Sequence, residues 1–241
     1  MHAFIISDLH LHPSRPEITL AFFDFIKDLP PSVNALYILG DFFDAWIGDD
    51  EDSPFSAEIA HAIFKLTEKG IAVYFTHGNR DFLLGEVYAN KAGMTLLPAI
   101  STLETKNKKI ILLHGDELCT RDHEYMALRA QMRNPVWQAQ ILQQPLAARR
   151  MLAQQLREKS ATMSSLKAQD IMDVTDSEVE NLLIAHNADI MIHGHTHRPN
   201  RHEIVINEKH CERIVLGDWH DLAWCIEITD DSVELRSWSI T

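Results

Sequence analysis

The chain has little cysteine, no long apolar run and no surplus of positive charge, and each of these absences excludes a class of protein. Cys119, Cys211 and Cys225 are odd in number and far apart, which argues against a disulfide framework or a cysteine zinc site and fits a reducing cytosol. No apolar run approaches the roughly 20 residues of a membrane-spanning helix, and the N-terminus lacks the features of a signal peptide. The net charge of −13 argues against a nucleic-acid-binding protein, which would present a basic face to phosphates.

The rest of the composition is that of an ordinary globular protein. Of the 241 residues, 46% are hydrophobic and 24% are charged, which supplies enough apolar material for a sizeable core. We therefore expect a soluble protein, or one that at most rests on the surface of a membrane.

Short apolar runs that end in a polar, often glycine-containing turn recur along the chain. Runs of about four to six β-branched or aromatic residues are typical of strands that are buried on both faces of an α/β sheet. Helical patterns over Glu17–Leu29 and Ala57–Lys69 separate the first three runs, and residues 224–240 predict a two-stranded hairpin. The runs with their turns are AFIISDLH, ALYILGDFFD, AVYFTHGNRD, KIILLHGDEL, DIMIHGHTHR and RIVLGDWH.

Asp, Asn and His side chains follow five of these runs at the point where each strand should end. One such residue alone is more often a cap or a turn former than a ligand. Because ligands of open α/β sheets bind beyond the carboxyl ends of the strands, we expect the five strand ends to form one site. His193 is left out, since it still belongs to its strand. The candidate ligands are Asp8, His10, Asp41, Asn79, His114, His195 and His197.

The types of these ligands indicate a pair of metal ions. Carboxylate, amide and imidazole groups without a thiolate suit a divalent ion such as Mn²⁺, Fe²⁺, Ni²⁺ or Zn²⁺. Seven ligands exceed the needs of one tetrahedral site, but they fit two ions about 4 Å apart that share a carboxylate, as in phosphoryl transfer. No Ser or Cys nucleophile with a plausible base is evident, which favours direct attack by a metal-activated water.

Residues 121–169 differ from the rest of the chain because they contain no glycine and almost no β pattern. They predict helices that are interrupted near Asn134–Pro135 and Gln144–Pro145, with eight Lys or Arg residues against three acids. We expect a helical cap that is inserted into a core of residues 1–120 and 170–241. The alternative is a solvated helical pair without a function.

The apolar residues of this region leave two interpretations open. They could form a groove for lipid chains, or they could be ordinary packing between helices and core. Arg149 and Arg150 are further interpreted as contacts to anionic lipid at a membrane surface. The apolar residues are Val136, Trp137, Ile141, Leu142, Leu146, Met151 and Leu152.

Five short motifs, SDLHL, LGDFFD, HGNRD, LLHGD and IHGHTHRP, occur in the order found in the calcineurin-like metallophosphoesterases, and the chain resembles that family over residues 1–120 and about 180–220. The resemblance implies an α/β fold in which a sandwich of two β-sheets is flanked by helices (α/β/β/α). It also implies that Asp44, Asp81 and Asp116 orient histidines or cap turns. One ion would be held by Asp8, His10, Asp41 and His197, and the other by Asp41, Asn79, His114 and His195, with Asp41 as the bridge.

Longer stretches, among them ALYILGDFFDAWIGDD and LLHGDELCTRD, are similar to the branch of this family that acts on UDP-linked diacylated glucosamine in lipid A biosynthesis. This similarity implies two Mn²⁺ ions and water attack on the α-phosphorus, giving UMP and 2,3-diacylglucosamine 1-phosphate. It also implies a cytoplasmic location at the inner membrane, and catalytic roles for Asp41, Asn79 and His195. The residues implied to contact the substrate are Asn79, Arg80, Asp122, Tyr125, Ser160, Ser164, Lys167 and His195.

Other functions remain open from the sequence. A dimetal phosphodiesterase or phosphatase for nucleotides or proteins would use the same core, but the basic and apolar cap region disfavours it. A metallophosphoesterase scaffold that only binds partners would be expected to lack ligands, whereas all seven positions are filled here. A role in DNA processing is disfavoured by the acidic balance of the chain.

Overall fold

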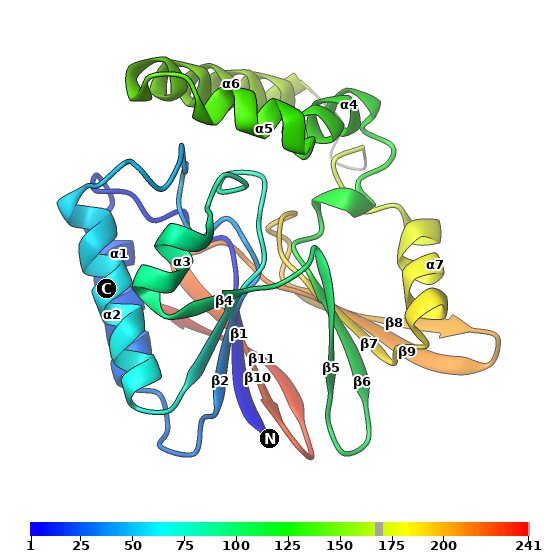
Figure 1. The fold of residues 1–241 in the computed structure, drawn as a ribbon. Helices are drawn as coiled ribbons and strands as arrows, with labels where there is room; N and C mark the ends of the chain where they lie inside the picture. Colours follow the sequence, from blue (N-terminus) through cyan, green and yellow to red (C-terminus); the bar gives the residue numbers. More distant parts are fainter. Residues whose placement is uncertain (167–170, 241) are drawn as a thin grey trace.

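Two β-sheets that pack face to face form the centre of the molecule (Figure 1). The structure is a computed structural model that describes residues 1–166 and 171–240, and for residues 159–166 it describes the backbone alone. Helices cover the outer face of each sheet, so the layers run helix, sheet, sheet, helix. This arrangement confirms the α/β/β/α sandwich expected from the resemblance.

The first sheet contains six strands: β1 (His2–Ile6), β2 (Ala35–Ile38), β3 (Ala72–Phe75), β4 (Met94–Leu96), β10 (Leu222–Thr229) and β11 (Val233–Ser239). Their order is β11-β10-β1-β2-β3-β4. β1 to β4 pair in parallel, while β10 joins β1 antiparallel and pairs with β11. The hairpin predicted over residues 224–240 is therefore confirmed.

The second sheet contains five strands: β5 (Ile100–Glu104), β6 (Lys109–Leu113), β7 (Ile190–His193), β8 (Asn200–Ile206) and β9 (Lys209–Val215). Their order is β5-β6-β7-β9-β8, with parallel pairing at the centre and antiparallel strands at both edges. The apolar runs did not predict β4, β5 or β8. These strands lie at sheet edges, where alternating or polar residues replace the continuous apolar run of a central strand.

The helices pack their apolar faces against the sheets. α1 (Pro16–Lys27), α2 (Pro54–Glu68) and α3 (Glu86–Ala92) cover the first sheet, and α7 (Asp176–His186) covers the second (Figure 1). α2 begins at Pro54 rather than at Ala57 as predicted, because Ser53 and Ser56 form a capping box and proline favours the first turn. α3 and α7 were not predicted.

α4 (His123–Met132), α5 (Pro135–Leu142) and α6 (Leu146–Leu166), here called the cap helices, lie together above the strand ends (Figure 1). The breaks between them fall at Pro135 and Pro145, as predicted, because proline interrupts the preceding helix. Asn134 caps the first turn of α5. No helix in the described part of the chain is long and apolar enough to cross a membrane. The division into a core of 1–120 and 170–241 and a cap of 121–169 stays a prediction.

Candidate metal centre

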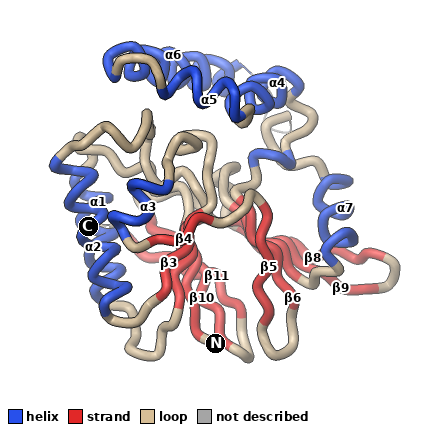
Figure 2. The backbone as a smooth tube through the Cα atoms, viewed as in Figure 1, coloured by secondary structure: helices blue, strands red, loops and turns tan. Residues whose placement is uncertain are grey.

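The candidate ligands lie in the layer of loops between the strand ends and the cap helices (Figure 2). Backbone hydrogen bonds tie these loops together. The His10 amide after β1 donates to the carbonyl oxygen of Asp41 after β2, at 2.9 Å. The His195 amide after β7 donates to Oδ2 of Asp8, at 3.0 Å, and so joins the two sheets. The carboxyl ends of strands from both sheets therefore meet at one place, as the sequence predicted.

Most of the candidate ligands have a left-handed backbone conformation. Residues other than glycine rarely adopt positive φ, and such strain concentrates at functional sites. Within the described residues eight non-glycine positions have it, and five of these eight belong to the candidate set. The five are Asp8 (57°), His10 (49°), Asp41 (49°), His195 (64°) and His197 (55°).

Asp8, His10 and His197 form a first group, with potential ligand atoms that all lie within 4.8 Å of one another. His197 Nε2 lies 3.2 Å from Asp8 Oδ1 and 3.4 Å from His10 Nε2. Asp41 approaches this group, since its Oδ2 atom is 3.9 Å from His10 Nδ1. These are the four side chains that the resemblance assigns to one ion.

Asp41 also faces a second group of side chains. Its Oδ1 atom is 3.7 Å from His114 Nε2, and Asn79 Oδ1 lies 3.0 Å from both His114 Nε2 and His195 Nδ1. One oxygen of the Asp41 carboxylate is thus directed to each group, which supports a bridging position. Asp8 also has a ligand atom within 4.8 Å of those of Asp41 and His114, so it lies close to both groups.

The hydrogen bonds of His114 indicate that a cation belongs in this site. Its Nδ1–H donates to the Leu39 carbonyl oxygen at 2.8 Å, so Nε2 is the ring nitrogen that is directed at the other candidate ligands. Nε2 faces the side-chain oxygens of Asn79 and Asp41, and burial of His114 is outweighed by the charges of Asp41 and Asp8, which raise the pKa of His114, so this position attracts positive charge. A divalent ion would satisfy all of these atoms, and metal-binding histidines commonly donate their other N–H to a carbonyl. The residues present therefore fit a metal site.

Burial and the neighbouring charges together shift the pKa values of the candidate ligands. Burial lowers the pKa of His10 to about 3 and that of His195 to about 3, which leaves both rings in the neutral form that binds metal. Burial, against the opposing effect of His114, raises the pKa of Asp41 to about 7. Burial also opposes protonation of His197, but the hydrogen bond to Asp8 and the charges of Asp8, Asp218 and Asp41 together outweigh it and raise that pKa to about 9. Metal binding is thus expected to release protons from Asp41 and His197.

Asp81 and Asp44 have different surroundings. Asp81 is fully buried and accepts hydrogen bonds from the amides of Phe42 and Gly78, each at 2.8 Å, so it holds the turns after β2 and β3. Asp44 instead forms an ion pair with Arg157 of α6. Asp81 therefore stabilises the turns that carry the candidate ligands, and Asp44 connects the core to a cap helix.

His193 remains in β7 with its ring fully buried, which confirms its predicted place in the strand. Its Nδ1–H donates to the Gly194 carbonyl oxygen at 2.8 Å, and its Nε2 accepts from Arg213 at 3.3 Å. Both ring nitrogens are already used, so His193 has no free ligand atom.

Asp218 lies beside the site and was not predicted. Its carboxylate is 3.7 Å from Nδ1 of His197, where it can orient that ring. The signal was present in the sequence, because Asp218 follows β9 as the other acids follow their strands. The run RIVLGDWH was interpreted as a strand and a turn, and no functional role was assigned to its aspartate.

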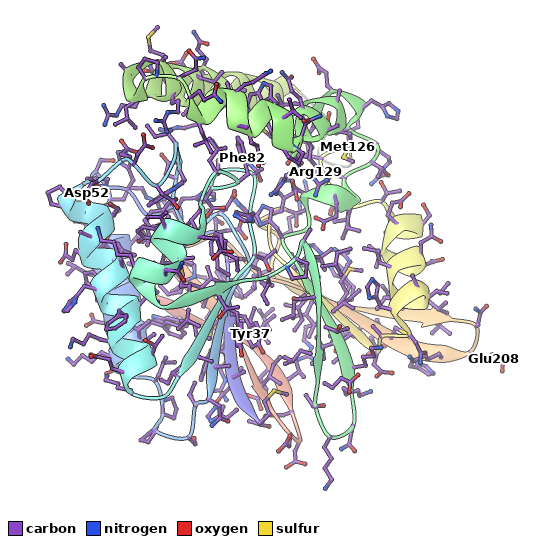
Figure 3. All side chains as sticks on the ribbon, viewed as in Figure 1. Tyr37, Asp52, Phe82, Met126, Arg129 and Glu208 are labelled. Carbon is purple, nitrogen blue, oxygen red and sulfur yellow. The ribbon has the colours of Figure 1, made fainter. Side chains whose placement is uncertain are left out.

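A pocket adjoins the candidate metal centre beneath the cap helices. Phe82 and Arg129 lie where the cap helices face the core loops (Figure 3). The polar lining of the pocket includes Asn79, which also contacts the second group of ligands. Its apolar lining comes from both core and cap, and consists of Ala45, Trp46, Ile47, Phe82, Leu83, Leu128, Met132, Trp137, Ile141, Leu152, Ala153, Leu156 and Met172.

Of the eight residues predicted to contact substrate, four line this pocket: Asn79, Arg80, Asp122 and Tyr125. A fifth, His195, lies beside Asn79 in the second group of ligands. Asp122 also caps α4, since its carboxylate accepts from the Tyr125 amide at 3.0 Å. The Tyr125 ring packs 5.6 Å from the ring of His195. The remaining predicted contacts lie outside the described residues or side chains: Ser160 and Ser164 are on the backbone-only part of α6, and Lys167 is not described.

The apolar residues of the cap helices divide between the pocket and the solvent. Trp137, Ile141 and Leu152 line the pocket. Val136 is 67% exposed and Met151 is 63% exposed. The apolar pattern was therefore neither a single groove nor simple core packing, because these side chains point to different sides of the cap.

The interpretation of Arg149 as a lipid contact was wrong. Its side chain is buried, donates to the Ile47 carbonyl oxygen at 2.7 Å and forms an ion pair with Asp50. Gly48 permits this approach, since a Cβ atom there would lie 2.3 Å from Nη1 of Arg149. Arg149 thus fastens α6 to the core, while Arg150 pairs with Glu51 at the surface.

Comparisons with known proteins agree with this geometry. A family model described as calcineurin-like phosphoesterase matches residues 1–199. A UDP-2,3-diacylglucosamine hydrolase of Cellvibrio japonicus is 52% identical over 240 residues, covering 100% of both chains. Proteins with the same name from Marinobacter nauticus (48% identical, 98% of this chain and 97% of the relative) and Stenotrophomonas maltophilia (50% identical, 92% of each) are also similar. The chain therefore belongs to the calcineurin-like phosphoesterase family.

Proposed function

We propose that this chain hydrolyses the pyrophosphate bond of UDP-2,3-diacylglucosamine. The observation that carries the proposal is the continuity between the candidate metal centre and the apolar pocket, which share Asn79. A substrate with a charged pyrophosphate and two acyl chains needs both surfaces next to each other. The full-length similarity to relatives that are named for this reaction supports the same substrate.

In this proposal the seven predicted ligands would hold two metal ions, which we propose to be Mn²⁺, and Asp41 would be a ligand in both groups. When bound, such ions activate water and offset the charge that develops at phosphorus. The residues of the chain then have separate roles. Arg80 lines the pocket beside the ligands, where a guanidinium can hold a phosphate oxygen. Asn79 and His195 adjoin the reacting phosphate.

The substrate extends from this centre into the pocket. Tyr125 and Asp122 contact the sugar and phosphate portions, and Ser160, Ser164 and Lys167 complete the proposed contacts from the cap. Trp137, Ile141 and Leu152 contact the acyl chains. Water attacks the α-phosphorus, so the products are UMP and 2,3-diacylglucosamine 1-phosphate. The proposal includes no nucleic-acid partner, because the net charge of −13 disfavours binding to phosphate backbones.

One experiment tests the reaction and the metal together. Protein that has been stripped with a chelator is incubated with UDP-2,3-diacylglucosamine in ¹⁸O-labelled water, with added Mn²⁺ or Ca²⁺. We expect UMP release to recover with Mn²⁺ at least about tenfold better than with Ca²⁺, because Ca²⁺ prefers sites made of oxygen ligands. The label should appear in UMP.

The same experiment has clear contrary outcomes. Label in the sugar phosphate would place the attack at the other phosphorus. Equal recovery with Ca²⁺ would contradict the histidine-rich ligand set. Absence of UMP from the Mn²⁺ sample would overturn the proposed substrate.

We further propose that the chain works in the cytoplasm as a peripheral protein on the cytoplasmic face of the inner membrane. The exposed apolar side chains of Val136 and Met151 lie on cap helices whose other residues line the pocket. Such side chains can enter the lipid interface while the substrate passes from the membrane to the pocket.

Flotation with vesicles that contain phosphatidylglycerol tests this location. The bound fraction of the chain should fall at least about tenfold when Val136→Glu and Met151→Glu are combined, because two apolar side chains no longer leave water. Unchanged flotation of the double variant would remove this face as the membrane contact. Replacement of two exposed acids far from the cap, Asp24→Ala on α1 and Asp28→Ala just after it, serves as a control for altered surface charge.

A further inference from the structure

Three side chains at regular spacing on the cap converge on one buried carboxylate. Tyr125, Arg129 and Arg133 are four residues apart, so they share one face of α4 and its C-terminal turn. They donate to Oδ2 of Asp116 at distances of 2.9, 2.8 and 3.4 Å. Asp116 is only 1% exposed and follows β6 directly after the His114 turn. This carboxylate thus connects the first cap helix to the second sheet.

Arg133 reaches beyond Asp116 to a loop of the first sheet. The Nη2 atom that contacts Asp116 also donates to the carbonyl oxygens of His77, at 3.2 Å, and of Gly78, at 3.1 Å. These two residues immediately precede Asn79, a candidate ligand. This link could not be predicted from the sequence, because a backbone carbonyl carries no residue-specific signal.

The Gly78 peptide is fixed on both sides. Its amide donates to Asp81 at 2.8 Å, and its carbonyl accepts from Arg133. The loop also lies against the bridging carboxylate, since a Cβ atom on Gly78 would be 2.2 Å from Oδ1 of Asp41. The Arg80 amide donates to the same oxygen at 2.8 Å. A displacement of this loop would therefore move Asn79, which belongs to the loop, and Asp41, which contacts it.

We propose that Arg133 is a positioning residue, which holds the 77–80 loop so that Asn79 and Asp41 are placed for metal binding and catalysis. Arg133 itself is oriented by Asp116, and its neighbour Met132 lines the pocket. The cap helices and the 77–80 loop are then held together as one unit. The inference deepens the proposed function and rests on it for the identity of the substrate.

The test uses the full chain with three substitutions. Arg133→Ala removes the contact, and Arg133→Lys keeps a donor. Arg150→Ala is the matched control. It removes the ion pair between the cap and Glu51 of the core, in which the arginine is 58% exposed and does not contact the 77–80 loop. Two properties are measured: kcat and KM for UDP-2,3-diacylglucosamine, and the Mn²⁺ concentration at half-maximal thermal stabilisation of chelator-treated protein.

For Arg133→Ala we expect kcat to fall about 10- to 100-fold and the Mn²⁺ midpoint to rise about tenfold, because displaced ligand supports have effects of this size. KM should change less than about threefold, since substrate contacts remain. Arg133→Lys should recover most of both losses, whereas Arg150→Ala should behave like the unaltered chain.

Other outcomes would overturn the inference. A higher KM with an unchanged Mn²⁺ midpoint would mean that Arg133 acts only on the pocket. No rescue by lysine would assign the effect to packing, and equal behaviour of Arg133→Ala and Arg150→Ala would leave Arg133 without a positioning role. If the unaltered chain released no UMP, the proposed function would fail, but the Mn²⁺ midpoints would still decide the role of Arg133.

Discussion

Replacement of Asp41 with alanine is expected to lower kcat for UMP release by about 1000-fold or more in the presence of Mn²⁺. Asp41 directs one carboxylate oxygen to His10 and the other to His114, so both groups of ligands lose a member at once. A metal ion contributes several kcal/mol of transition-state stabilisation, and each 1.36 kcal/mol corresponds to a tenfold change in rate. Steady-state kinetics at saturating substrate measure the loss.

The stability of the metal-free protein gives an independent check. Since burial raises the pKa of Asp41 from 3.8 to about 7, the folded state binds this proton more tightly than the unfolded state does. The stability that the proton contributes is fully present below the pKa of the unfolded state, and it is lost as the pH rises through the pKa of the folded state. In chelator, the melting temperature of the unaltered chain should therefore decrease as the pH is raised from about 4 to about 7. The Asp41→Ala variant should lack this part of the pH dependence.

A charge-matched replacement far from the site provides the control. Asp24 is an exposed residue of α1, and Asp24→Ala should leave both kcat and the pH dependence unchanged. If Asp41→Ala kept full activity with metal present, the bridging assignment of this carboxylate would be wrong.

Introduction of a charge into the pocket should separate lipid recognition from the chemistry. Leu152→Glu is expected to lower kcat/KM for detergent-dispersed UDP-2,3-diacylglucosamine by about 100-fold or more. The side chain lines the apolar pocket, and an unpaired charge there costs several kcal/mol when an acyl chain excludes water. Hydrolysis of a short soluble phosphodiester, which does not enter this part of the pocket, should be much less affected.

Met151→Glu is the paired control on the same helix. Met151 is adjacent in sequence but 63% exposed, so the same substitution there changes charge and helix propensity without entering the pocket. Its kcat/KM in detergent should stay within about threefold of the unaltered chain, as is usual for surface changes. Parallel losses in Leu152→Glu for both substrates, or equal losses in both variants, would contradict an acyl-binding role of the pocket.

The local pattern of the sequence predicted the central strands and the candidate ligands. A continuous apolar run followed by Asp, Asn or His is a short-range signal, because a central strand and its terminal turn are both set by neighbouring residues. Asp8, Asn79 and His114 could be selected on this basis without knowledge of their partners. The breaks at Pro135 and Pro145 are equally local, since proline restricts its own backbone and that of the preceding residue.

Edge strands and pocket surfaces could not be predicted in the same way. β5 and β8 have little continuous apolar sequence, because one side of an edge strand has no neighbour to bury it. Leu152 and Met151 are both apolar and adjacent in sequence, yet Leu152 lines the pocket and Met151 faces the solvent. Only the way in which α6 docks on the core separates them.

The sequence by itself determined which residues could bind metal, where the strands of the two sheet centres run and where the cap helices break. The tertiary structure decided which oxygens face Nε2 of His114, that Arg149 is buried against Gly48 and Asp50, and that Arg133 contacts the 77–80 loop. The physical reason is the range of the interactions. Turn chemistry and helix caps act within a few residues, whereas ion pairs and pocket walls join segments that only the packing of sheets and cap brings together.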